Sequence, residues 1–157
     1  MGAKEPITAK SYFSGAGGMD LGLSLSGIKI VQSLELDPSA CRTLEYNMDH
    51  RVMQMDIREI EVKRQEPTHL IVGTYPCTKY SSIADVTNNR IGDDLFLHLF
   101  RHIAIEQPEA YLVENVPGMK KFPVVMEAMS KLPNYYINIL CPVNALNWLP
   151  QSRPRLS

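Results

Sequence analysis

The sequence is poor in cysteine, has no long apolar run and carries no excess of charge of either sign. Its three cysteines form no CxxC pair, which argues against a disulfide framework and against a zinc knuckle. No apolar stretch approaches the roughly 18 residues that span a bilayer, and the N-terminus shows no basic segment followed by an apolar one. We therefore expect a reducing compartment: the cytoplasm for a bacterial or phage-derived protein, or the nucleus for a eukaryotic one.

The charge balance bears on the choice of partner. Lys and Arg number 16 and Asp and Glu number 17, which gives a formal net charge of −1. Proteins that hold nucleic acid by its phosphates usually cluster Lys and Arg, so composition alone does not indicate such a partner. The 157 residues, 45% of them hydrophobic, suffice for one core without a metal or a disulfide. Because no repeat, low-complexity tract or linker interrupts the chain, we expect one domain over residues 1–157.

Short β-rich segments alternate with amphipathic ones along the chain. The segments expected to be strands are 7–13, 28–36, 52–56, 69–75, 110–116 and 135–143. Strands that alternate with helices pair in parallel through right-handed crossovers. The pattern predicts an α/β fold with a Rossmann-like, doubly wound, mostly parallel sheet, in which ligands bind at the carboxyl ends of the strands.

Several residues are typical of helix starts. Asp37 is a candidate N-cap with Pro38 at the first helical position, Asp93 or Asp94 could cap a longer helix, and Pro123 could begin a shorter one. The longer helix has one apolar stripe, made of Leu95, Leu99 and Ile103. His98 and His102 lie one turn apart on it, but no third metal ligand has suitable spacing, so we interpret them as ordinary helix residues.

A glycine-rich stretch, FSGAGGMDLGL over residues 13–23, connects the first expected strand to a helix. Glycines there let the backbone approach a ligand closely, and a helix N-terminus favours an anionic group such as a carboxylate. A phosphate-binding GxGxxG loop counted from Gly15 would need glycine at its sixth position, where Asp20 stands. The stretch therefore predicts either a ligand loop of another kind or a plain tight turn.

Acidic residues follow three of the expected strands. Glu35 ends the second strand, where a carboxylate can accept both hydroxyls of a ribose. Asp56 follows the third strand and could accept from an adenine amino group, with Ile57 packed on the ring. Glu114, in the ENV stretch, ends a later apolar strand. For Glu35 the alternative is a solvated strand end, and for Asp56 it is a simple turn.

The loop after the fourth expected strand holds a candidate nucleophile. Cys77 is flanked by Pro, Thr, Lys and Ser rather than by an apolar run, and a loop on a rigid sheet is where a reactive thiol is usually presented. Cys41 and Cys141 fall on an apolar helix face and in an expected strand, so we interpret both as small buried hydrophobes. Near the C-terminus, Arg153 and Arg155 in QSRPRL could form forked hydrogen bonds with a phosphate or a carboxylate, or could be solvated.

Taken in order, FxGxGG, the acid pair, PC, ENV and QxRxR resemble the DNA (cytosine-5) methyltransferases, from Phe13 to the end of the chain. The resemblance implies a class I methyltransferase fold that binds S-adenosylmethionine and releases S-adenosylhomocysteine. It also implies a cofactor site made of Phe13, Gly15, Ala16, Gly17, Gly18, Glu35, Leu36, Asp56, Ile57, Pro76 and Leu95, with no metal.

The same resemblance implies a mechanism at carbon 5 of cytosine. The thiolate of Cys77 would add to carbon 6, which makes carbon 5 nucleophilic toward the methyl group. Glu114 would hold the ring nitrogen and the exocyclic amine, while Arg155 and Arg153 steady the base and its phosphate. Carbon 6 is buried in double-stranded DNA, so the cytosine must be flipped out of the duplex.

Two features depart from the family pattern. Thr78 stands where the family usually has Gln after the catalytic Cys, and the sequence ends at Ser157, before the target-recognition region and the closing motifs. We expect a truncated enzyme or one whose recognition region lies on a second chain, which would explain the near-zero charge. The alternatives are a tRNA cytosine-5 methyltransferase and a non-catalytic methyltransferase-like module; a nicotinamide-dependent oxidoreductase is disfavoured by Asp20 and by the PC loop.

Overall fold

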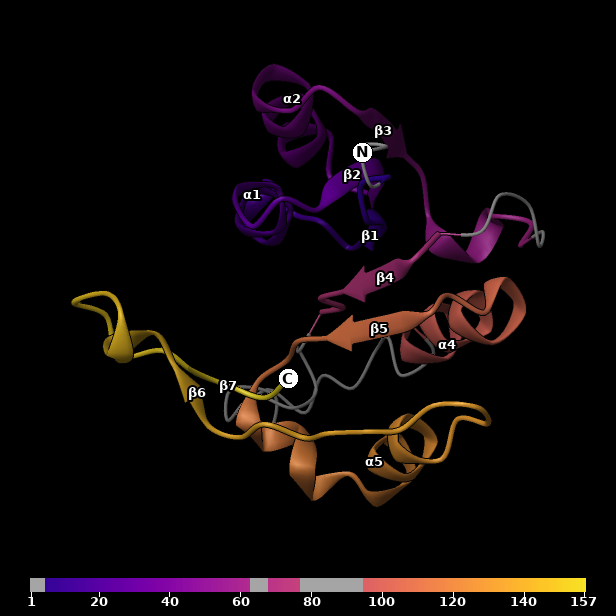
Figure 1. Ribbon diagram of the computed structural model, residues 1–157, viewed down its shortest axis with the longest axis vertical. Helices are drawn as coiled ribbons and strands as arrows, with labels where there is room; N and C mark the ends of the chain where they lie inside the picture. The colour runs from indigo at the N-terminus through magenta and orange to yellow at the C-terminus, as the bar shows by residue number, and fades with distance from the viewer. Residues whose placement is uncertain (1–4, 63–67, 77–94) are drawn as a thin grey trace.

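The computed structural model describes residues 5–62, 68–76 and 95–157. Its centre is a five-stranded sheet in which every neighbouring pair is parallel (Figure 1). The strands are β1 (Thr8–Tyr12), β2 (Lys29–Glu35), β3 (Arg51–Gln54), β4 (Leu70–Gly73) and β5 (Ala110–Val113). They confirm five of the six expected strands and the predicted α/β class, because each is a short β-rich run bounded by turns.

The strand order places a ligand site at one edge of the sheet. The order is β3-β2-β1-β4-β5, so the chain moves outward from β1 to β3 and then crosses back to β4 on the other side of β1. Loops that leave β1 and β4 therefore diverge at the carboxyl ends of these strands. This topological switch point is where open α/β sheets bind their ligands.

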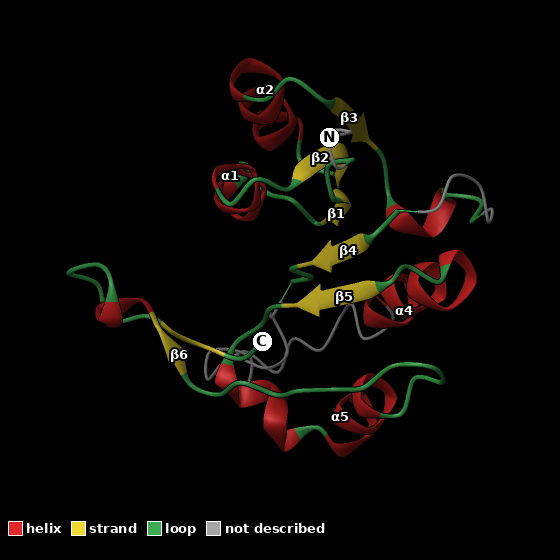
Figure 2. Cartoon of the chain, viewed as in Figure 1, coloured by secondary structure: helices red, strands yellow, loops and turns green. Residues whose placement is uncertain are grey.

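Helices cover both faces of the sheet (Figure 2). Ser11 and Ser33 are register partners on β1 and β2 and share one face, where the Ser33 hydroxyl donates to Asp20 of helix α1 (Gly18–Leu25). Tyr12 points to the opposite face and contacts helix α4 (Leu95–Glu106). The sheet is therefore doubly wound, as the alternating sequence pattern predicts.

The remaining helices begin close to the expected residues. In α2 (Pro38–Asn47) the Asp37 carboxylate accepts hydrogen bonds from the backbone N–H groups of Ser39 and Ala40, both at 2.8 Å. Helix α5 (Pro123–Ser130) begins at Pro123. Cys41 of α2 is buried, as expected for a small hydrophobe. The capping role predicted for Asp93 or Asp94 falls outside the described residues.

The prediction of a sixth strand over residues 135–143 is wrong for most of its length. Only Val143–Asn144 forms a strand, β6, paired antiparallel with β7 (Pro154–Arg155). Upstream of β6, Leu140 exchanges backbone hydrogen bonds with Ser157, but none of residues 135–142 forms a strand. Cys141 is consequently half-buried outside any strand, not a buried strand residue. A β-rich composition does not make a strand where no continuous partner is available.

Helix α4 packs directly on the strand that leads to the predicted nucleophile loop. A Cβ atom placed on Gly73, the last residue of β4, would lie 2.4 Å from Cδ2 of Leu99. Leu99 is fully buried in the main apolar cluster together with Ile71 and Ile103. The absence of a side chain at position 73 therefore sets the close approach of α4 to the sheet.

Candidate functional site

A cavity of about 450 Å³ opens at the carboxyl ends of the parallel strands. It is bounded by residues that follow β1, β2, β3 and β4, and by the first residue of α4. Its lining residues are Phe13, Leu34, Glu35, Leu36, Asp37, Pro38, Met55, Asp56, Ile57, Arg58, Thr74, Pro76 and Leu95. A mostly apolar cavity of this size with a few carboxylates is typical of a small-molecule or cofactor site.

Seven of the eleven residues predicted for the cofactor line this cavity: Phe13, Glu35, Leu36, Asp56, Ile57, Pro76 and Leu95. They come from five different segments of the chain and are brought together by the strand order. The four remaining residues do not line the cavity: Gly15, Ala16 and Gly17 belong to the adjoining loop, and Gly18 is the first residue of α1.

Glu35 is a structured carboxylate, not a solvated strand end. Its Oε1 accepts hydrogen bonds from the backbone N–H groups of Leu36 and Asp37, at 2.7 and 2.9 Å, and its Oε2 accepts from that of Gly15 at 2.8 Å. These contacts connect the loop after β1 with the end of β2. A carboxylate offers about four acceptor positions, so Glu35 retains capacity for a ligand hydroxyl.

The glycine loop owes its shape to three residues in the left-handed region. Phe13 has φ +58°, Gly15 has φ +55° and Gly17 has φ +89°. A Cβ on Gly17 would lie 2.7 Å from Cδ2 of Leu44, and glycine adopts such a conformation without the strain that a side chain causes. Gly17 is the N-cap of α1, so the loop directs the start of that helix toward the carboxyl edge of the sheet.

Asp20, the residue that breaks the dinucleotide pattern, is buried behind this loop. Its Oδ2 accepts from the Ser33 hydroxyl at 2.5 Å and lies 3.9 Å from His50 Nε2. Burial lowers the pKa of His50, against the opposing effect of Asp20. The Asp20 side chain therefore connects α1 with β2 and with His50, the residue before β3, and does not line the cavity.

Asp56 and Ile57 form the wall contributed by the segment after β3. Asp56 is the N-cap of η1 (Ile57–Glu59), and its carboxylate accepts from the backbone N–H of Arg58 at 2.9 Å. The Arg58 guanidinium also lies 2.8 Å from Asp56 Oδ2, and these hydrogen bonds hold the pKa of Asp56 below its usual range. Asp56 is therefore an oriented, ionised acceptor at the edge of the cavity.

Glu114 and Arg155 meet although they are far apart in the sequence. Arg155 Nε lies 2.5 Å from Glu114 Oε1, and each side chain is about one fifth exposed (21% and 23%). The pair is placed by the next residues: Asn115 and Leu156 exchange backbone hydrogen bonds of 2.9 and 2.8 Å. Arg153, in contrast, lies on an exposed stretch two residues earlier, so the structure brings only one of the two predicted arginines to Glu114.

The predicted nucleophile, Cys77, and the unusual Thr78 lie outside the described residues. The residue before them, Pro76, lines the cavity, and Tyr75 is fixed beside Glu114 because Asn115 Nδ2 donates to its carbonyl oxygen at 3.2 Å. The described residues before Cys77 therefore border the cavity through Pro76 and contact Asn115, the residue after Glu114, through Tyr75.

Sequence reasoning missed six lining residues: Leu34, Asp37, Pro38, Met55, Arg58 and Thr74. Each is next to, or two residues from, a residue that was predicted, so extending each motif along the strand end would have found them. Thr74 also has a structural role, because its hydroxyl donates to the Phe13 carbonyl oxygen at 2.7 Å.

A second cavity of about 300 Å³ is lined by residues of β5, by residues 134–139 and by Leu156 and Ser157. Within the described ranges, no group of three or more His, Cys, Asp and Glu residues is arranged to hold a metal ion. No helix in the same part of the chain is both long and apolar enough to cross a membrane.

Comparison with known proteins gives a consistent result. Residues 7–157 match the family model for C-5 cytosine-specific DNA methylase. Type II methyltransferase M.AquIA of Picosynechococcus sp. is 36% identical over 123 residues, which is 69% of this chain and 48% of that protein. Type II methyltransferase M.Bsp6I of a Bacillus species is 30% identical over 161 residues, which is 93% of this chain and 49% of that protein.

Solved structures agree. A putative DNA modification methyltransferase encoded within an Escherichia coli prophage superposes with a TM-score of 0.77 at 28% identity, over 96% of this chain and 45% of that one. The S. pombe Dnmt2 methyltransferase superposes with a TM-score of 0.74 at 22% identity over 96% of this chain, a likeness of fold. This chain spans about half the length of the relatives it matches.

Proposed function

This chain belongs to the C-5 cytosine-specific DNA methylase family, and from that premise we propose that it binds S-adenosylmethionine and takes part in methyl transfer to carbon 5 of cytosine in DNA. The observation that carries the proposal is the cavity at the switch point. There a ribose-compatible carboxylate, Glu35, and an adenine-compatible pair, Asp56 and Ile57, line one space with apolar walls from Phe13 and Leu95.

The donor and acceptor set fits a sulfonium nucleoside. Glu35 would accept the ribose hydroxyls, Asp56 would accept the adenine amino group, and Ile57, Pro76 and Leu95 would surround the ring. The loop over residues 15–18 would approach the methionine part by its backbone, near the N-terminus of α1, which favours the carboxylate. S-adenosylmethionine, when bound, would supply an electrophilic methyl group.

The residues around Glu114 would perform the chemistry on the base. The Cys77 thiolate would form a bond to carbon 6, so that electron density moves to carbon 5, and carbon 5 then takes up the methyl group. Glu114 would hold the ring nitrogen and the exocyclic amine, and Arg155 would keep that carboxylate in place. Loss of the proton from carbon 5 to a base then lets the Cys77 sulfur leave and restores the aromatic ring.

We propose that residues 1–157 form the cofactor-binding catalytic domain of this enzyme and that target recognition is supplied elsewhere, by another segment or by a second polypeptide. A net charge of −1 gives the domain little general attraction for a duplex. The flipped cytosine would enter beside Glu114, while the phosphate contacts would come largely from the recognition region.

Changing Glu35 to Gln tests the cofactor assignment. The variant loses the charged acceptor of the ribose hydroxyls, and we expect the Kd for S-adenosylhomocysteine to rise roughly tenfold or more. The measurement is a titration of the ¹⁵N-labelled chain, followed by chemical shifts, which detects affinities into the millimolar range. Glu45→Gln on the exposed side of α2 is the matched control and should bind like the wild type. Equal affinity in Glu35→Gln and in the wild type would remove Glu35 from the cofactor site.

A further inference from the structure

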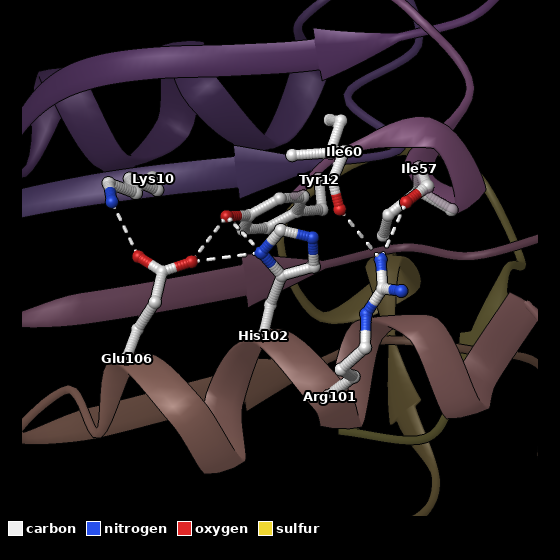
Figure 3. A network of polar contacts seen from close by, with 7 residues as sticks. All are labelled: Lys10, Tyr12, Ile57, Ile60, Arg101, His102 and Glu106. Carbon is white, nitrogen blue, oxygen red and sulfur yellow. Dashed lines mark hydrogen bonds and ion pairs between the residues drawn. The ribbon is translucent and has the colours of Figure 1, made fainter. Parts of the chain in front are cut away.

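The wall of the cavity that Asp56 and Ile57 provide is held from outside the cavity. Arg101 projects from α4, is not among the lining residues, and donates from Nη2 to the backbone carbonyl oxygens of Ile57 and Ile60, both at 3.0 Å (Figure 3). These two carbonyls belong to the first residue of η1 and to its C-cap. Arg101 therefore connects the two ends of that short turn by hydrogen bonds to their carbonyl groups.

The hydrogen bonds from Arg101 fix the backbone of η1, whose Ile57 side chain is buried in the main apolar cluster. The turn has three residues, and carbonyl groups at a helix end lack partners within the helix. A guanidinium that donates to such carbonyls forms stronger hydrogen bonds than a neutral donor does. At the N-cap of the turn, the Asp56 carboxylate accepts hydrogen bonds from the backbone and the guanidinium of Arg58. Arg101 therefore holds the backbone of the turn that carries the Asp56 carboxylate, together with the core packing of Ile57.

Helix α4 is in turn fixed to the sheet. The next residue, His102, and Glu106 one turn later both bond to the hydroxyl of Tyr12, at 2.9 and 2.8 Å, and Lys10 Nζ lies 2.5 Å from Glu106 Oε2 (Figure 3). Tyr12 directly precedes Phe13, a lining residue. One helix therefore holds the adenine-side wall in a set position relative to the strand at the centre of the site.

We propose that Arg101 is a positioning residue that gives the cavity its selectivity for adenine over hypoxanthine, a proposal that rests on the proposed cofactor function. Adenine presents an amino donor at position 6, which the Asp56 carboxylate can accept. Hypoxanthine presents a carbonyl there, which the same carboxylate repels. The discrimination requires Asp56 to stay in place, and Arg101 holds the turn that carries it.

The test compares the Kd values of S-adenosylhomocysteine and S-inosylhomocysteine for the wild type, Arg101→Met and Arg101→Lys. We expect the wild type to bind the adenine compound roughly tenfold or more tightly than the hypoxanthine compound. Arg101→Met should reduce that preference below about threefold, mainly by raising the Kd of the adenine compound. Lysine keeps a charged donor and should restore most of the preference. Arg51→Met, an exposed arginine on β3, is the matched control and should change neither value.

A double-mutant cycle distinguishes positioning of Asp56 by Arg101 from a general structural role of Arg101. In an Asp56→Ala background, Arg101→Met should produce no further loss of selectivity, because the group that it positions is gone. If Arg101→Met does not fold, Arg101→Gln replaces it with the same expected loss. Selectivity that survives in folded Arg101→Met or Arg101→Gln overturns this inference alone, whereas no binding of either nucleoside by the wild type refutes the proposed cofactor function and this inference with it.

Discussion

Methyl transfer to cytosine and covalent capture of 5-fluorocytosine DNA are both expected to fall by at least about 10³-fold when Cys77 is changed to serine. A serine hydroxyl is a far weaker nucleophile than a thiolate at neutral pH, so carbon 6 is not attacked. Fluorine at carbon 5 cannot leave as a proton does, so in the unmodified enzyme the adduct persists. The measurement is a denaturing gel of protein with a labelled duplex in which every cytosine is 5-fluorocytosine, in the presence of S-adenosylmethionine.

The matched control is Cys141→Ser, which changes a half-buried cysteine outside the proposed site and should leave capture unchanged. The assay combines the chain with a segment or polypeptide that supplies DNA recognition, because we expect the 157-residue chain alone to methylate DNA no faster than its Cys77→Ser variant. Undiminished capture by Cys77→Ser, or robust methylation by the isolated chain, would contradict the mechanism or the division of roles.

The second large effect is on stability. Glu106→Ala is expected to lower the free energy of unfolding by about 3–5 kcal/mol, because it leaves Lys10, Tyr12 and His102 without their shared carboxylate inside the fold. Glu106 is 9% exposed, and Tyr12 and His102 are each 2% exposed, so water cannot replace the lost acceptor. Urea unfolding followed by circular dichroism measures the change.

The same group predicts how stability depends on pH. Burial alone would raise the pKa of Glu106, but its hydrogen bonds to His102, Lys10 and Tyr12 lower it from the ordinary 4.5 to about 2. A carboxyl whose pKa is lower in the folded protein stabilises the fold above the unfolded value. That stabilisation is lost as the pH falls from about 4.5 toward about 2.

Glu127→Ala is the control for both measurements. Glu127 pairs with Lys131 on the exposed surface of α5, where solvent screens the interaction, so no measurable loss of stability is expected. Unfolding curves of Glu106→Ala that match those of Glu127→Ala, with the same dependence on pH between 2 and 4.5, would show that the buried cluster does not stabilise this fold.

The predictable part of the fold is the part with local signals. Strand β4 is a short apolar run between turns, β2 contains Ile, Val and Leu between turns, and α2 carries its own cap at Asp37, so each can be recognised from neighbouring residues. The strand prediction for residues 135–142 failed for the opposite reason, because a strand there needs a partner strand from elsewhere in the chain. The contacts that do form, between Leu140 and Ser157, join residues far apart in sequence.

The same division applies to the site. Glu35, which ends β2, and Asp56, which follows β3, could be predicted to share one edge because parallel strands bring their carboxyl ends together there. The role of Arg101 could not be predicted, because it depends on α4 packing beside η1, a contact between distant parts of the sequence. His102 was interpreted as an ordinary helix residue, yet it bonds to Tyr12, 90 positions away, and only the packed structure reveals that contact.

The central claim is that the cavity at the switch point holds the adenosine part of the cofactor. A crystal structure of this chain with S-adenosylhomocysteine tests it most directly. We expect the ribose hydroxyls within about 2.6–3.2 Å of the Glu35 carboxylate, and the adenine against Ile57 with its amino group toward Asp56. A ligand bound instead between β5 and residues 134–139, or an adenine remote from Asp56, would contradict the account.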